Sequence, residues 1–130
     1  MADLVGIVLV SHSADLARGL RDVLLQVSTE DVPVEVAGGT EDGRIGTSYD
    51  RIAAAIDRAD RGAGVVVLTD LGSAVLTTRA VLDDREADDV VLVDAPFVEG
   101  AVAAAVLAGT GADLAAVTAS AREARDVAKL

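Results

Sequence analysis

The chain has 130 residues, a length that predicts a single domain, spanning residues 1–130, with a core large enough to fold independently. Its 22 acidic and 11 basic residues give a formal net charge of −11, which argues against binding of nucleic acid or an anionic membrane through a basic surface. The absence of cysteine excludes disulfides and thiolate metal sites, and a single histidine excludes multi-histidine metal sites. We therefore expect neither a metal nor a cofactor.

Hydrophobic residues make up 52% of the chain and aromatic residues only 2%, so the core must be built from small aliphatic side chains. The longest apolar stretches are too short for a signal-peptide core, and far shorter than the roughly 20 residues that span a bilayer. This composition favours a cytoplasmic protein without membrane insertion.

Four short apolar runs predict the strands of a parallel sheet. Residues 4–10, 64–69 and 90–93 are apolar without alternation, which is typical of strands covered on both faces. Residues 32–37 form a weaker run of the same kind. Residues 115–117 are a candidate for a short fifth strand at the edge of the sheet.

Helical patterns separate these runs. Four segments with apolar residues at helical spacing cover, in chain order, residues 16–27, 49–56, 73–82 and 98–107. In the first of them the apolar stripe consists of Leu16, Leu20, Val23, Leu24 and Val27. Thr47 and Asp50 resemble a capping box ahead of the second segment, and Ser120 and Glu123 form another, which predicts a last helix from Ser120 to about residue 128.

The alternation of strands and helices predicts an α/β fold with three layers, in which helices cover both faces of a doubly wound, mostly parallel sheet. Right-handed crossovers leave few strand orders, and we expect the order 2-1-3-4, with the candidate fifth strand at the edge. In such sheets ligands bind beyond the carboxyl ends of the strands, where the strand order reverses. That point lies between the first and third strands.

The only histidine of the chain falls at this point. Ser11, His12 and Ser13 follow the first strand, and the segment from Asp70 to Ser73 follows the third. A lone histidine in a loop is more often an ordinary surface residue, and Asp70 has an alternative role as the N-cap of the next helix. The position of His12 opposite a carboxylate nevertheless favours a functional site.

These side chains fit the transfer of a phosphoryl group onto the imidazole. Asp70 would accept the N–H of one ring nitrogen of His12, leave the other nitrogen free to attack phosphorus, and stabilise the positive ring that results. Ser13, Ser73 and the backbone amides around Gly72 would hold the phosphoryl oxygens.

A glycine-rich segment, residues 38–48, follows the second strand. Glycine allows backbone N–H groups to approach an anion closely, so we expect Gly39 and Thr40 to contribute to phosphate binding. The spacing matches neither a dinucleotide-binding fingerprint nor a P-loop, and a mobile turn is an equally good interpretation. Residues 96–100 lie at the same edge and would shape the rim of the site.

Four segments together resemble one family. They are GIVLVSHS at residues 6–13, GGTEDGRIGTS at 38–48, DLGSA at 70–74 and PFVEG at 96–100. They are similar to DhaM, the family of phosphoryl-transfer subunits of the phosphoenolpyruvate-dependent dihydroxyacetone kinases, whose fold is that of the mannose-class EIIA domain. The resemblance runs nearly from end to end of the chain.

The resemblance implies a relay. His12 matches the residue that accepts a phosphoryl group from phospho-HPr, and Asp70 matches the acidic residue beside it. The phosphoryl group would pass to ADP bound in a DhaL subunit, which acts with DhaK on dihydroxyacetone. The resemblance also implies a homodimer, and because the chain ends at Leu130, the HPr-like and enzyme-I-like steps would belong to separate proteins.

Several alternatives stay open. A mannose-type EIIA domain of a sugar permease shares the chemistry, although the segment at residues 70–73 is shorter than in those domains and lacks their tryptophan. A receiver-like domain phosphorylated on Asp70 is weakened by Ser11 and His12, which stand where an acidic pair would bind Mg²⁺. A Ser-His-Asp hydrolase lacks the G-x-S-x-G sequence, and a non-catalytic adaptor is the remaining class.

Overall fold

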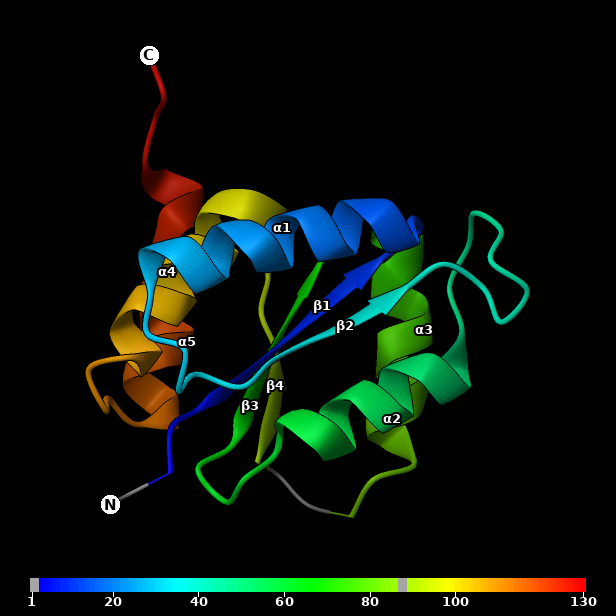
Figure 1. The fold of residues 1–130 in the computed structure, drawn as a ribbon, viewed down its shortest axis with the longest axis horizontal. Coiled ribbons are helices and arrows are strands. Elements are labelled where there is room, and N and C mark those ends of the chain that lie inside the picture. Colours follow the sequence, from blue (N-terminus) through cyan, green and yellow to red (C-terminus); the bar gives the residue numbers. More distant parts are fainter. Residues whose placement is uncertain (1–2, 87–88) are drawn as a thin grey trace.

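Four parallel strands form the centre of the fold (Figure 1). The computed structural model describes residues 3–86 and 89–130. Its strands are β1 (Gly6–Ser11), β2 (Val34–Gly38), β3 (Val65–Thr69) and β4 (Val90–Leu92). They lie in the order β2-β1-β3-β4 with every pairing parallel, which confirms the predicted sheet and its strand order.

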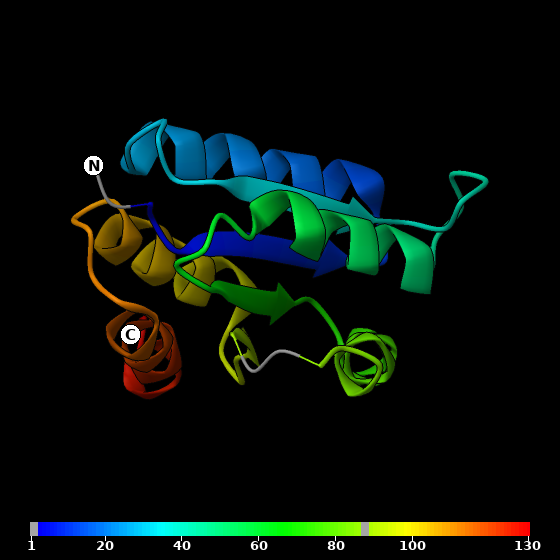
Figure 2. The ribbon, with the colours of Figure 1, turned by 90° about the horizontal axis from the view of Figure 1, so that it is seen from below.

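Helices cover both faces of this sheet, giving the three expected layers (Figure 2). One face is covered by α1 (Ala14–Val27), α4 (Phe97–Ala108) and α5 (Leu114–Glu123), and the other by α2 (Tyr49–Ala59) and α3 (Gly72–Asp83). A short 3₁₀ helix, η1 (Ala124–Asp126), follows α5. No helix among the described residues has the length and apolar character that crossing a bilayer would require.

The central strand β1 contributes to both halves of the core. Ile7 and Leu9 pack with the helices α1, α4 and α5, whereas Val8 and Val10 pack with α2 and α3. All four side chains are fully buried. Successive side chains of a strand point to opposite faces, so a strand that is covered on both faces must be apolar at every position.

The segment at residues 115–117 is helical, so the prediction of a fifth strand there is wrong. It lies in α5, where Asp113 is the N-cap and its carboxylate accepts the Ala116 N–H at 2.9 Å. Val117 and Ala121 are buried on one side of the helix. A run of three small apolar residues fits either structure, and the cap together with the helical preference of alanine decides for the helix.

The prediction of a last helix beginning at Ser120 is also wrong. Ser120 lies in the final turn of α5, which ends at Glu123, and the chain beyond η1 is extended and exposed. In α2, the N-cap is Ser48 in place of Thr47, because the Ser48 hydroxyl accepts the Arg51 N–H at 3.2 Å.

Helix α1 buries less of its apolar stripe than its sequence predicts. Leu20 and Leu24 are buried, but Leu16, Val23 and Val27 are 47%, 44% and 47% exposed. The stripe is therefore wider than the line along which α1 contacts the sheet.

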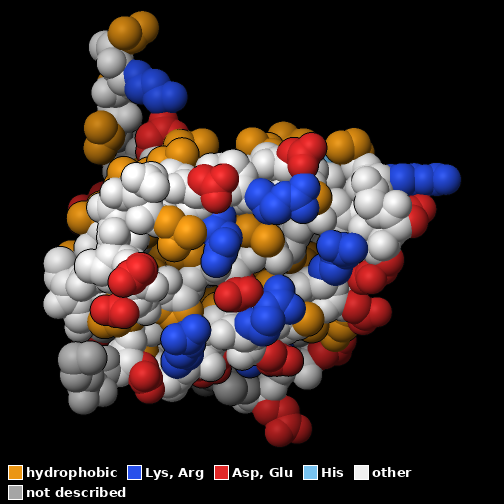
Figure 3. Space-filling model, in the orientation of Figure 1, with side chains coloured by type: hydrophobic (Ala, Val, Ile, Leu, Met, Phe, Trp, Pro, Cys, Tyr) orange, Lys and Arg blue, Asp and Glu red, His pale blue; other side chains and the backbone are white. Residues whose placement is uncertain are grey.

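The outer strand β2 is covered at its edge by arginines. Arg21 donates from Nε to the Val34 carbonyl at 2.9 Å, and Arg58 donates from Nε to the Glu35 carboxylate at 2.8 Å. Figure 3 shows basic side chains interspersed with carboxylates over the face that carries α1, β2 and α2. Charged side chains over an edge strand hinder pairing with another chain.

Gly6 tests how closely β1 approaches α2, and Gly19 on α1 serves as the control. A Cβ on Gly6 would lie 2.2 Å from the Ala59 carbonyl oxygen, so we expect Gly6→Ala to lower the free energy of unfolding by about 1–3 kcal/mol. The control is Gly19→Ala on α1, where nothing lies within 4 Å, and where alanine should stabilise the helix by about 0.5–1 kcal/mol. Urea denaturation measures both changes, and equal effects at the two positions would contradict the packing described.

Candidate functional site

The parallel register of β1 and β3 brings the two polar loops together. Val10 pairs with Thr69, and the Asp70 N–H donates to the Val10 carbonyl at 3.1 Å. His12, two residues beyond Val10, therefore lies beside Asp70 at the carboxyl edge of the sheet. The predicted juxtaposition of these two residues is confirmed.

The Asp70 carboxylate accepts four hydrogen bonds. Its Oδ2 accepts the Ser11 hydroxyl at 3.0 Å and the His12 backbone N–H at 2.9 Å. Its Oδ1 accepts the Leu71 N–H at 2.7 Å and lies 2.9 Å from His12 Nδ1. Asp70 is not the N-cap of α3, because Leu71 occupies that position. The carboxylate instead connects the two loops.

These contacts determine the charge of Asp70 and the tautomer of the ring. Burial by itself would raise the pKa of Asp70, but hydrogen bonds from the His12 backbone, the His12 ring and the Ser11 hydroxyl outweigh it and lower the pKa below its ordinary 3.8. An ionised carboxylate has no proton to donate, so the proton between the two side chains belongs to Nδ1. In the neutral ring, Nε2 therefore carries the free lone pair.

Nε2 lies on the outer side of the ring. Ser73 places its Oγ 2.5 Å from Nε2, and in the neutral ring with its proton on Nδ1 the hydroxyl is the donor. The His12 side chain is 17% exposed, against 8% for Asp70. One nitrogen of the ring is thus anchored in the protein, whereas the other meets a hydroxyl at the surface.

The first turn of α3 faces the same place. No side-chain hydrogen bond caps α3, and its first turn holds no acidic residue. The first-turn amides of a helix have no partner within the helix and attract anions. Gly72 and Ser73, both expected from the sequence to hold phosphate, are the first two residues of this turn.

The other expected phosphate ligands are engaged elsewhere. The Ser13 hydroxyl accepts the Leu16 N–H at 3.2 Å as the N-cap of α1. Gly39 donates its N–H to the Ser11 carbonyl at 3.0 Å, and Thr40 donates its own to the Arg44 carbonyl at 2.9 Å. A role for these three residues in holding phosphate stays a prediction.

The glycine-rich loop instead holds the backbone of the histidine. Gly46 donates its N–H to the His12 carbonyl at 2.9 Å. Gly46 has φ +147° and Gly39 has φ +75°, values that side-chain-bearing residues rarely adopt. These glycines therefore allow the loop to adopt its backbone conformation.

Two residues of the site were missed in the sequence. Ser11 is fully buried, donates to Asp70 and accepts the Ser13 N–H at 3.1 Å, and Leu71 contributes its N–H. In the sequence, a hydroxyl-bearing residue directly after the apolar run of residues 4–10 could have identified Ser11 as part of the site. The contribution of Leu71 comes from its backbone, so its residue type carries no signal.

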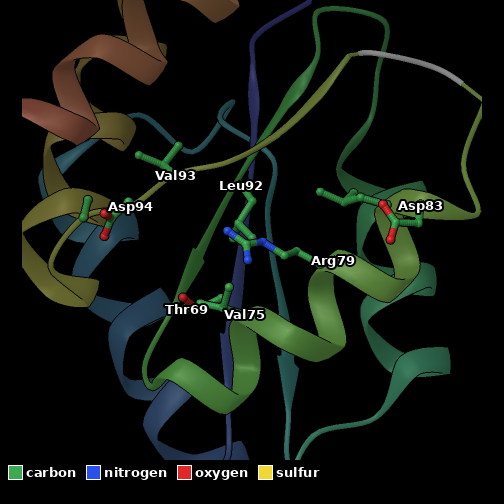
Figure 4. A pocket seen from close by; sticks show the side chains of 9 residues that line it. Thr69, Val75, Arg79, Asp83, Leu92, Val93 and Asp94 are labelled. Atoms are coloured by element: carbon green, nitrogen blue, oxygen red, sulfur yellow. The ribbon is translucent and has the colours of Figure 1, made fainter.

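The His12 side chain, 17% exposed at the rim of the sheet, lies outside the pocket between α3 and the segment after β4. A pocket of about 570 Å³ opens between α3 and the segment after β4, and its lining includes Thr69, Arg79, Leu92 and Asp94 (Figure 4). His12, Asp70 and Ser73 do not line it. Within residues 3–86 and 89–130, no group of three or more His, Cys, Asp or Glu side chains is placed to hold a metal ion.

This geometry equips one ring nitrogen for nucleophilic attack. An anionic partner fixes the tautomer of the neutral ring, and the Ser73 hydroxyl, in the first turn of α3, lies beside Nε2. The exposure of Nε2 at the rim of the sheet gives access to a group carried by another protein.

A family model described as "EIIA-man: PTS system fructose IIA component" matches residues 6–118. The chain is 43% identical over 107 residues to the phosphoryl donor subunit DhaM of the PEP-dependent dihydroxyacetone kinase 1 of Listeria innocua, covering 81% of this chain and 82% of that one. It is 35% identical over 114 residues to the phosphotransferase subunit DhaM of the PTS-dependent dihydroxyacetone kinase of Lactococcus lactis, covering 86% and 89%.

Two further similarities concern chain length and fold. The DhaM of Escherichia coli is 35% identical over 117 residues, but the match covers 25% of that longer protein. A crystal structure described as that of the "unknown function protein EF1359" superposes with a TM-score of 0.83 at 38% identity, covering 92% of this chain and 94% of that one.

The lowered pKa of Asp70 predicts a pH-dependent stability. The unfolded carboxyl titrates at its ordinary 3.8 and the folded one below it, so the ionised group stabilises the fold above 3.8 and this contribution is lost as the pH falls through the folded pKa. We expect the difference in unfolding free energy between the native chain and Asp70→Asn to be constant at neutral pH and to shrink below 3.8. Urea denaturation across a pH series measures it. A difference that does not change with pH would contradict this account.

Proposed function

This chain belongs to the EIIA-man family and, within it, to the DhaM-type phosphoryl donor subunits of PEP-dependent dihydroxyacetone kinase, and from this premise we propose that His12 carries the phosphoryl group. The observation that carries the proposal is the ring itself. Asp70 holds Nδ1 at 2.9 Å, so that Nε2 carries the lone pair and faces the surface. Nε2 is the nitrogen that we propose to be phosphorylated.

The proposed transfer needs no proton exchange with solvent. The Nε2 lone pair of His12 attacks phosphorus as the bond between phosphorus and the donor's leaving atom breaks, and the pair of electrons in that bond stays with the donor. The ring then carries a proton on Nδ1 and the phosphoryl group on Nε2, and is positive. The Asp70 carboxylate stabilises that charge. Transfer of the phosphoryl group from Nε2 to the acceptor reverses these changes.

Ser73 is the proposed first ligand of the phosphoryl group. Its hydroxyl now donates to Nε2, the lone pair that must bond to phosphorus. Rotation of the hydroxyl toward a phosphoryl oxygen would release the nitrogen and keep a hydrogen bond. The first-turn amides of Gly72 and Ser73 are the proposed ligands of further oxygens, because such amides have no partner within the helix.

The proposed partners follow from the family. The donor is phospho-HPr, and the acceptor is ADP in a DhaL subunit, which acts with DhaK on dihydroxyacetone. We further propose that residues 1–130 act as a single phosphocarrier domain in the cytoplasm, and that two copies form a homodimer. Relatives of similar length that are named DhaM support this assignment over a sugar permease component.

Phosphorylation of Asp70 itself is the less favoured chemistry. Each of its carboxylate oxygens already accepts two hydrogen bonds, and its side chain is 8% exposed. Attack by either oxygen on phosphorus would disrupt the contacts that join the two loops. The nitrogen at the surface has only the Ser73 hydroxyl to displace.

His12→Ala tests the acceptor directly. The variant should fold with a urea midpoint near that of the native chain, yet take up no label from phosphoenolpyruvate, enzyme I and HPr. Ser73→Ala is the comparison variant: it keeps the nucleophile and should therefore still take up label, although the loss of the proposed phosphoryl ligand should slow the labelling. Full labelling of His12→Ala would exclude His12 as the acceptor.

Asp70→Asn tests the role of the carboxylate. The amide is nearly isosteric but neutral, so it neither holds the proton on Nδ1 reliably nor stabilises the charged ring. We expect the rate of labelling from phospho-HPr to fall by about 10²–10⁴, the range typical of a lost acid–base partner. Rapid-quench measurement of phosphoprotein formation gives this rate, and an unchanged rate would confine Asp70 to joining the loops.

A further inference from the structure

A buried hydroxyl joins the end of β1 to the Asp70 carboxylate. Ser11, the last residue of β1, is fully buried, and its Oγ lies 3.0 Å from Asp70 Oδ2. Its backbone is fixed in the sheet, since Ser11 pairs with Gly38 and its carbonyl accepts the Gly39 N–H at 3.0 Å. A side chain carried by a strand is placed more precisely than one on a loop. The hydroxyl therefore has a defined position beside the carboxylate.

The partners of this hydroxyl determine where its proton points. The Ser13 backbone N–H donates to Ser11 Oγ at 3.1 Å, and a backbone amide nitrogen can only be a donor. The hydroxyl proton is then left for Asp70 Oδ2, which as an ionised oxygen can only accept. Full burial of Ser11 keeps water from competing for either contact. The hydroxyl thus donates to the carboxylate in one fixed direction.

Ser11 supplies the one donor to Asp70 that belongs neither to the backbone nor to the ring. Of the four hydrogen bonds that the carboxylate accepts, two come from the backbone amides of His12 and Leu71 and one from the His12 ring. Oδ2 is held by Ser11 and by the His12 backbone, whereas Oδ1 meets Nδ1 of the ring. Because both oxygens lie in one rigid plane, holding Oδ2 also sets the direction from which Oδ1 meets the ring.

We propose that Ser11 is a positioning residue of the phosphoryl transfer: its hydroxyl fixes the plane of the Asp70 carboxylate and, through that plane, the orientation of the His12 ring. The inference rests on the proposed function of His12. A fully buried side chain cannot contact a donor protein, so the effect of Ser11 reaches the reacting nitrogen only through Asp70. A misdirected ring slows the attack, because Nε2 must meet phosphorus in line with the bond that breaks.

The experiment removes the hydroxyl in two ways and compares it with another buried hydroxyl. Ser11→Ala deletes it, and Ser11→Cys fills the space but leaves only a weak donor. The matched control is Thr78→Val, which removes a fully buried hydroxyl that donates to the Ala74 carbonyl at 2.8 Å within α3. Rapid-quench labelling of His12 against phospho-HPr concentration gives a limiting rate and a half-saturating concentration. Urea midpoints establish which variants are folded.

The folded Ser11 variants should lower the limiting rate by about tenfold to a hundredfold and leave the half-saturating concentration unchanged, because a lost orientation slows the attack without altering the docking of the donor. Thr78→Val should lower the urea midpoint and keep the native limiting rate. This split between the two kinetic constants distinguishes a positioning role from a general loss of stability.

A double-variant cycle tests whether Ser11 acts through Asp70. In an Asp70→Ala background the acceptor of the hydroxyl is gone, so adding Ser11→Ala should lower the limiting rate no further. A native limiting rate in the Ser11 variants would overturn the inference. So would an equal fall in Thr78→Val, a raised half-saturating concentration with a native limiting rate, or a further fall of similar size in the double variant. If His12 of the native chain takes up no label, the proposed function itself fails, and the inference with it.

Discussion

One ionised carboxylate holds the site together. Asp70 directly follows β3. It accepts hydrogen bonds from Ser11, the last residue of β1, and from the backbone and ring of His12, the residue after it. A buried charge is tolerated only when donors replace the water that it has lost. Three of the four donors come from Ser11 and His12, so the contacts that satisfy the carboxylate also orient the ring.

The orientation of the ring gives its two nitrogens different roles. Nδ1 faces the protein and is held by a charge, and Nε2 faces outward toward the Ser73 hydroxyl. The proposed phosphocarrier role requires the nucleophile to be presented to a donor and then to an acceptor, which a deep pocket would prevent. The position of the ring at the rim of the sheet, beside the uncapped start of α3, meets this requirement while neutral donors remain available for the phosphoryl oxygens.

Apolar patterning predicted most of the fold because each layer leaves a regular pattern of apolar residues in the sequence. Strands covered on both faces must be apolar throughout, and helices between them show their period, so the strand order and the meeting of His12 with Asp70 could be expected before the structure. The prediction failed where the signal was short. Residues 115–117 fit strand and helix equally, and the cap supplied by Asp113 decided the outcome.

The sequence by itself determined the α/β class, the strand order, and the placement of the only histidine opposite a carboxylate, because these depend on periodicity along the chain and on general rules of chain crossover. Only the tertiary structure decided which donors satisfy Asp70, which ring nitrogen stays free, and that the amides of Gly39 and Thr40 already donate to the carbonyls of Ser11 and Arg44. It also decided that Leu71 and Leu76 stand exposed. The physical reason is that hydrogen-bond partners and exposure depend on residues about 60 positions apart in the chain, whose distances no local pattern encodes.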